Sequence, residues 1–188
     1  AFVDTGDGVT IGGLIIAGSE PKTVVIRAIG PDLANRGVEG ALLDPNIQLF
    51  SGPDLIDSND DWDSHARKAE IPANLVPQFQ LESAIVATLE PGPYTAIVRG
   101  NNEATGVGLV EIFEVAESDS KLINIATRGL VGTGDNVMIG GLIISGDTPQ
   151  TVLVRAVGPS LTSKGVPNAL QDPILQIFSG PNLLETNN

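Results

Sequence analysis

The segment of the sequence with the most side chains that could bind a metal or act as acids and bases is acidic. Five of its ten residues, from 54 to 63, are aspartate. Four oxygen-bearing side chains recur in it at every second position, namely Asp57, Asn59, Asp61 and Asp63. Oxygen ligands at this spacing are typical of a calcium loop, where the ion takes about six to eight oxygens. The turn glycine and the bidentate glutamate of an EF-hand are missing, and Asp and Asn side chains also cap solvated turns. A calcium site and a capped turn therefore both stay open.

Two arginines, Arg27 and Arg155, stand inside otherwise apolar stretches. An unpaired charge is costly there, so we expect structural ion pairs, with anion binding as the functional alternative. The predicted carboxylate partners are Asp7 and Asp44 for Arg27, and Asp135 and Asp172 for Arg155.

Catalytic residue types are scarce. The chain has no cysteine and one histidine, which excludes thiolate nucleophiles and multi-histidine metal sites. His65 lies in a polar segment and is predicted to be exposed, and no Gly-x-Ser-x-Gly motif occurs. Trp62 is predicted to pack over the acidic segment, with contact to a ligand such as a glycan as the alternative. The sequence predicts a protein that is not an enzyme.

Charge and hydropathy exclude two classes of partner. The net charge is −13, and only ten Lys and Arg residues are scattered along the chain, whereas nucleic-acid binding needs clustered positive charge. No apolar run approaches the roughly 18 residues of a membrane-spanning helix. We therefore expect neither nucleic-acid binding nor membrane insertion.

Short runs rich in Val and Ile, bounded by Gly and Pro, are typical of strands. The predicted strands are residues 9–16, 23–29, 47–50, 84–89, 94–99, 107–115 and 122–127. Turn residues at 90–93 and 100–102 predict that residues 84–115 form an antiparallel meander. About seven such strands predict an all-β fold, an antiparallel β-sandwich of the Ig-like or jelly-roll type.

The sequence also repeats itself. Residues 1–60 align with residues 129–188 without a gap, and 33 of the 60 aligned pairs are identical. The offset is constant throughout, so Ala1 aligns with Gly129, Arg27 recurs as Arg155 and Phe50 recurs as Phe178. This pattern predicts tandem repeats of a unit as long as the segment 1–128.

The repeat divides the chain into expected parts. We expect one unit in residues 1–115, a short linker in 116–121 and the first half of the next unit in 122–188. The predicted strand at 122–127 precedes the second copy and has no equivalent ahead of Ala1, so the first unit is expected to lack its first strand. An open sheet edge is a template for a further strand. We expect that strand to come either from sequence upstream of Ala1 or from another copy of the chain by strand addition.

Five stretches resemble a tandem repeat of large secreted and cell-surface proteins of bacteria. They are Asn-Ile-x-Thr-Arg-Gly at 124–129, Gly-Thr-Gly-Asp-Asn-Val-x-Ile-Gly-Gly at 132–141, Pro-x-Thr-Val-x-x-Arg-Ala-x-Gly-Pro at 149–159, Leu-x-Pro-Gly-x-Tyr-Thr-Ala at 89–96 and Gly-Val-x-Leu-Val-Glu at 106–111. The chain is also similar, more weakly, to the β-sandwich domains that follow secreted peptidases. The resemblance implies an extracellular, non-catalytic module, which fold alone would not.

Two functions are compatible with these features. The first is a structural repeat of an extracellular filament or surface fibre, with other copies of the chain as partners. The second is an accessory module of a secreted enzyme that binds carbohydrate or calcium. Calcium is the one cofactor that the sequence suggests, and a glycan is the one ligand.

Overall fold

The computed structural model describes residues 1–134, 136–144 and 146–188. The chain forms two compact units, Ala1–Gly140 and Gly141–Asn188, which are called unit 1 and unit 2 below and are described separately. No helix in these described ranges has the length and apolar character needed to cross a membrane.

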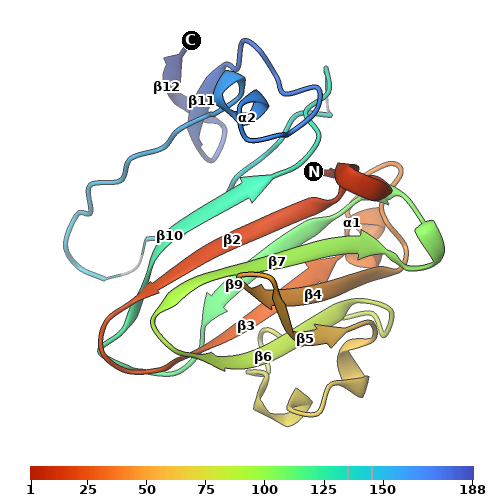
Figure 1. The fold of residues 1–188 in the computed structure, drawn as a ribbon, viewed down its shortest axis with the longest axis vertical. Helices are drawn as coiled ribbons and strands as arrows, with labels where there is room; N and C mark the ends of the chain where they lie inside the picture. The colour runs from red at the N-terminus through yellow and green to blue at the C-terminus, as the bar shows by residue number, and fades with distance from the viewer. Residues whose placement is uncertain (135, 145) are drawn as a thin grey trace. The chain divides into compact units, whose positions relative to one another are not determined.

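The larger sheet of unit 1 has five antiparallel strands (Figure 1). In spatial order they are β10 (Lys121–Arg128), β2 (Thr10–Ala17), β7 (Gly92–Gly100), β4 (Pro45–Ser51) and β5 (Asp54–Asn59). Burial along β2 alternates residue by residue, because successive side chains of a strand point to opposite faces. Its inward face carries Leu14 and Ile16, both almost fully buried.

The smaller sheet has β3 (Lys22–Ile29) in the centre, between β6 (Ser83–Leu89) and β9 (Leu109–Glu114). Val24 and Ile26 lie in a core cluster that also contains residues of the larger sheet. Val25, between them in sequence, lies in a second cluster with Ile71 and Val86. Both faces of β3 are therefore covered, which explains why Val24, Val25 and Ile26 are apolar in succession without alternation.

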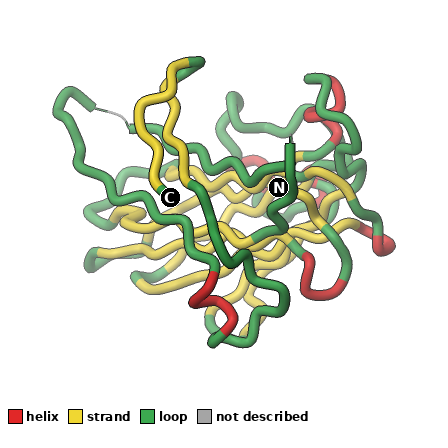
Figure 2. Tube along the Cα trace, turned by 90° about the horizontal axis from the view of Figure 1, so that it is seen from above, coloured by secondary structure: helices red, strands yellow, loops and turns green. Residues whose placement is uncertain are grey.

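The remaining elements of unit 1 are short (Figure 2). Strands β1 (Phe2–Val3) and β8 (Gly106–Val107) form a two-stranded sheet. Helix α1 (Pro31–Asn35) follows β3, and single 3₁₀ turns span Gly6–Gly8, Trp62–Ser64, Lys68–Glu70 and Asn101–Glu103. Gly30, just before α1, is required by space, because a Cβ there would lie 1.8 Å from the Leu42 carbonyl oxygen.

Unit 2 contains helix α2 (Pro159–Thr162) and the hairpin of β11 (Leu175–Ser179) and β12 (Asn182–Asn187). These elements are the second-copy equivalents of α1, β4 and β5. The β11–β12 register has its irregularity between Ile177 and Phe178, and the β4–β5 register has its own between Leu49 and Phe50. A Cβ on Gly158 would clash with the Leu170 carbonyl oxygen, just as a Cβ on Gly30 would clash with that of Leu42. The two sequence copies thus adopt the same local structure in these elements.

The prediction of an all-β fold is confirmed, since antiparallel sheets dominate the described residues. The predicted meander at 84–115 is wrong: β6 and β9 belong to the smaller sheet, and β7 between them belongs to the larger one. The turn at 90–93 therefore crosses from one sheet to the other. Strand β5 was missed, because its aspartates indicated a loop.

The predicted part boundary also differs from the structure. The strand expected to open the second unit, β10, is hydrogen-bonded along β2, and unit 1 extends to Gly140. Strand β10 thus completes the larger sheet of unit 1 beside β2, although the sequence placed it at the start of the second unit. The physical reason is that β2 would otherwise leave a row of backbone groups unpaired.

Candidate functional site

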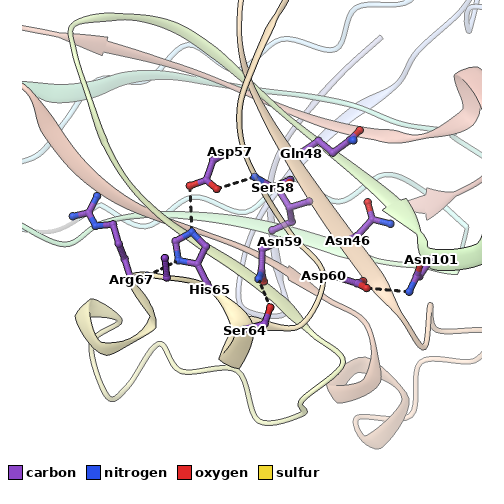
Figure 3. Close-up of a pocket in the computed structure, with 12 residues that line it drawn as sticks. Asn46, Gln48, Asp57, Ser58, Asn59, Asp60, Ser64, His65, Arg67 and Asn101 are labelled. Carbon is purple, nitrogen blue, oxygen red and sulfur yellow. Dashed lines mark hydrogen bonds and ion pairs between the residues drawn. The ribbon is translucent and has the colours of Figure 1, made fainter.

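The acidic segment lines a surface depression of about 530 Å³ in unit 1 (Figure 3). Strand β4 contributes Asn46 and Gln48 to its wall, and β5 with the turn that follows contributes most of the rest. The labelled polar side chains in it are Asn46, Gln48, Asp57, Ser58, Asn59, Asp60, Ser64, His65, Arg67 and Asn101. Two of the four predicted metal ligands, Asp57 and Asn59, line the depression together with the single histidine, whereas Asp61 and Asp63 do not.

His65 is buried, with 6% of its surface exposed, and not exposed as predicted. Its Nδ1 accepts a hydrogen bond from the backbone N–H of Arg67 at 3.3 Å, so the ring proton of the neutral form belongs on Nε2. That nitrogen lies 3.2 Å from Asp57 Oδ2 (Figure 3). Both ring nitrogens are therefore engaged, and neither is free to take a proton from a nucleophile.

Asn59 is also buried, and both the nitrogen and the oxygen of its side-chain amide form hydrogen bonds. Its Nδ2 donates to the Asp61 carbonyl oxygen at 2.8 Å and to Ser64 Oγ at 3.2 Å. Its Oδ1 accepts from the backbone N–H of Ala84 at 2.9 Å. Because Asn59 ends β5 and Ala84 lies in β6, this one side chain ties the larger sheet to the smaller one.

The four predicted calcium ligands have separate tasks in the structure. Asp57 faces His65 and accepts from the backbone N–H of Ser58, and Asn59 holds β6. Asp61 offers its backbone carbonyl to Ser64, and Asp63 lies 3.4 Å from the amide of Gln80. Among the described residues no group of three or more His, Asp or Glu side chains is arranged to hold a metal ion. In the structure these four residues contact other protein groups, and Asp61, at the N-cap of the 3₁₀ turn Trp62–Ser64, makes no side-chain capping hydrogen bond.

Asp60 and Asn101 line one end of the depression, and Asn101 joins Asp60 to a second carboxylate, Asp44. The Asn101 side-chain amide donates to Asp44 Oδ2 at 3.2 Å and to Asp60 Oδ2 at 3.1 Å. Partial burial, followed by the negative charges of Asp44 and Asp61, raises the pKa of Asp60. This corner joins β4, β5 and the loop after β7, and no local pattern in the sequence indicated it.

Arg27 does not pair with its predicted partners. Its guanidinium donates to Glu111, through Nε at 3.0 Å and through Nη2, and to the Leu75 carbonyl oxygen at 2.6 Å. It also stacks over the Phe113 ring, 5.1 Å from the centroid. Glu111 lies directly opposite Arg27 in the β3–β9 register, and such cross-strand neighbours interact most closely. Asp44 instead meets Asn101, and Asp7 lies in the exposed 3₁₀ turn at Gly6–Gly8.

The second-copy arginine, Arg155, lies apart from any such network among the described residues. Arg155 and Asp172 are exposed, and Arg155 forms no ion pair with any carboxylate in the described ranges. Asp135 lies outside the described residues.

Trp62 packs against the second core cluster beside Ile71 and Val86. Its indole therefore covers the outer face of the smaller sheet, and the depression is lined by other residues. This position makes Trp62 a packing residue of the segment that covers β3 and β6.

Glu82 is a buried acid that sequence reasoning missed. It is fully buried, and its Oε1 accepts from the backbone N–H of Asp32 at 2.9 Å in α1. Its Oε2 is buried without a hydrogen-bond partner among the described residues. Burial raises the pKa of this carboxyl, against hydrogen bonds from backbone groups that lower it. Glu82 anchors α1 to the start of β6.

Comparisons with known protein families, with curated proteins and with solved structures found no match to this chain. Its function is therefore inferred from its own sequence and geometry.

Proposed function

We propose that this chain is a non-catalytic structural repeat of an extracellular bacterial filament or surface fibre, which assembles through neighbouring repeats. Each repeat, equal in length to the segment 1–128, would be an antiparallel β-sandwich of the Ig-like or jelly-roll type. The observation that carries the proposal is the recurrence of one hairpin at the equivalent place of the second copy, with its irregularity at the same step.

The start of the second copy gives further support. Strand β10 runs antiparallel to β2 and so returns the chain to the end of the sheet where β2 begins. Leu130 there forms an isolated bridge with Phe2, its own counterpart in the first copy. A Cβ on Gly129 would lie 3.0 Å from the Cβ of Ala1, again its counterpart. Equivalent residues of successive copies thus lie side by side, as expected where repeats stack on their neighbours.

The chemistry of the depression is consistent with a structural role. His65 and Asn59, its most buried polar residues, use their side chains to hold the segment against the sheets. The extracellular location is proposed from the resemblance carried by residues 132–141 and 149–159.

Electron microscopy of the purified chain, with sedimentation over a range of concentrations, tests the proposal. We expect beaded rods or fibres whose fraction rises with protein concentration. A chain that stays monomeric at millimolar concentration, with no ordered assembly in the micrographs, would contradict the proposal.

A second candidate is a carbohydrate-binding accessory module of a secreted enzyme. The amides of Asn46, Gln48 and Asn101 in the depression favour it, because such groups hydrogen-bond sugar hydroxyls. Binding on a glycan array that is lost in Gln48→Ala, but kept in the packing variant Trp62→Phe, would support this function. Equal binding by Gln48→Ala and the unmodified chain would exclude the depression as the glycan site.

A further inference from the structure

Strand β10 forms one edge of the larger sheet of unit 1 (Figure 1). Among the described residues it pairs with β2 alone, so its other side joins no ladder there. Six of its eight residues are exposed, including Ile123 at 64% and Ile125 at 53%. A long, exposed edge strand with apolar side chains and no proline is a site where a further strand can be added.

Strand β5, the opposite edge of the same sheet, has features that disfavour such addition. It carries Asp54 and Asp57, and its register with β4 is irregular. Charged side chains and bulges are means by which edge strands avoid pairing with other chains. Strand β10 carries no carboxylate, and its charged residues, Lys121 and Arg128, are positive. A positive edge is complementary in charge to a second copy of a chain whose net charge is −13.

The strand directions decide which edges of two copies can pair. Each step from β10 through β2, β7 and β4 to β5 is antiparallel, so β10 and β5 run in the same direction. When two copies keep their core faces on the same side of a shared sheet, antiparallel pairing therefore joins like edges only. Unlike edges would have to pair in parallel, which is less stable per residue.

Ile125 fixes the register of such a junction. It lies opposite Leu14 in the β10–β2 register, and residues directly opposite each other share one face of a sheet. That face is the core face, since Leu14 is 1% exposed. A two-fold axis at Ile125 sets this side chain against its own counterpart and continues the apolar layer across the junction. A shift by one residue would set Asn124 opposite Ile125 and so pair opposite faces of the two sheets.

We infer that a second copy of this chain pairs with the free edge of β10 through its own β10, antiparallel and about a two-fold axis at Ile125. The larger sheets of the two copies then form one continuous sheet. This inference rests on the proposed function and deepens it, because it names the surface through which two fibre chains lie side by side. Backbone hydrogen bonds and the contact between the two Ile125 side chains supply the attraction.

Single cysteine variants test the pairing, since the chain has no cysteine of its own. Oxidised Ile125→Cys should form a disulfide-linked dimer, because residues opposite each other in an antiparallel pair lie within disulfide reach. Leu55→Cys in β5 is the matched control, with an exposed fraction of 52% at the other edge. Its dimer should form at least about 10-fold more slowly, because no pairing holds its thiols together.

Two results of this experiment would overturn the inference. One is an equal rate of dimer formation by the two variants. The other is a mixed disulfide as the main product when the two variants are oxidised together, which would show that β10 of one copy pairs with β5 of the next.

A charge exchange at the axis tests the two-fold contact without oxidation. Ile125→Lys and Ile125→Asp should each dimerise at least about 10-fold more weakly than the unmodified chain, because each sets two like charges opposite each other. An equimolar mixture should restore dimers, since the heterodimer pairs opposite charges. Circular dichroism melting checks that both variants fold, and sedimentation measures the dimers. A mixture no more dimeric than either variant alone would overturn the inference.

Two further measurements separate the inference from the proposed function. Hydrogen exchange at the residues of β10 whose amides face away from β2 should slow as the concentration of the unmodified chain rises. Slow exchange there at every concentration would overturn the inference, because the edge would then be covered within one chain. Fibres that persist in Ile125→Lys would contradict the β10 contact and leave the filament standing. Dimers of the unmodified chain without fibres would support the β10 contact and contradict the filament.

Discussion

At the scale of single residues, three polar side chains of unit 1 join separate segments of the chain. Asn59 links β5 to β6, His65 links Asp57 to the backbone of Arg67, and Arg27 links β3 to β9 and to Leu75. Each is at least partly buried, where an unmade hydrogen bond costs more than a made one gains. We therefore expect substitutions at these residues to change stability.

Arg27→Ala should lower the free energy of unfolding of unit 1 by about 1–3 kcal/mol, because it leaves Glu111 partly buried without its partner. Arg36→Ala is the matched control, since that arginine pairs with Asp32 on the exposed surface, where ion pairs contribute little. Urea unfolding followed by tryptophan fluorescence measures both. A loss at Arg36 as large as that at Arg27 would contradict the assignment.

Glu82 should make the stability of unit 1 depend on pH. Burial raises the pKa of this carboxyl above its ordinary value of 4.5 in the folded state, so the folded protein binds its proton more tightly than the unfolded chain does. The stability that Glu82 contributes is then fully present below pH 4.5 and is lost as the pH rises through the folded-state pKa. In Glu82→Gln this decline should vanish, while Glu39→Gln, an exposed control, should keep it. Thermal unfolding between pH 4 and 7.5 measures the slopes, and parallel slopes in wild type and Glu82→Gln would contradict the prediction.

At the scale of elements, β10 decides where the first unit closes. In the sequence this strand directly precedes the second copy. In the structure it completes the larger sheet beside β2, with Ile125 opposite Leu14 and Ala126 opposite Gly13. Leu122 packs against the core cluster of that sheet. The strand that leads into the second sequence copy thus completes the larger sheet of unit 1.

Ala126→Pro should destabilise unit 1 by about 1–2 kcal/mol, because proline cannot donate to the β10–β2 ladder. The freed edge of β2 should also promote aggregation. Thr186→Pro in β12 is the control, since among the residues that the structure describes this strand pairs with β11 alone. Circular dichroism melting with light scattering would measure both effects. Unfolding of unit 1 unchanged by Ala126→Pro would place β10 outside its fold.

At the scale of the whole molecule, the net charge of −13 and the pI of about 4.2 oppose self-assembly at neutral pH. Copies of a chain with this charge repel one another at neutral pH. Attraction between copies must therefore come from apolar contacts and from backbone pairing.

Assembly of the purified chain should therefore accelerate as salt rises from about 20 to about 500 mM, because the screening length falls from tens of ångströms to a few. Turbidity and sedimentation at matched protein concentration would measure the rate, with sucrose of equal osmolality as the control. A rate that falls with salt would show that ion pairs between copies dominate the association.

Local features of the sequence determined which segments form extended strands. The alternation at Leu14 and Ile16, the apolar run at Val24–Ile26 and the turn glycines act over a few residues, so strand positions and the all-β class could be predicted from them. The repeat was equally visible, because it is a comparison of the chain with itself. The aspartates of residues 54–59 indicated a loop, but this segment is an exposed strand, β5, which pairs with β4.

Only the tertiary structure decided which strands meet. The partner of Arg27 is 84 residues away and that of Asn59 is 25 residues away, while β2 pairs with a strand from the far end of unit 1. Such pairings depend on which sheet each strand joins and in what register, and a shift of one residue would turn every side chain to the other face. Burial of His65 and Glu82 follows from the same packing, since it is set by the elements that close over them and not by their neighbours in the sequence.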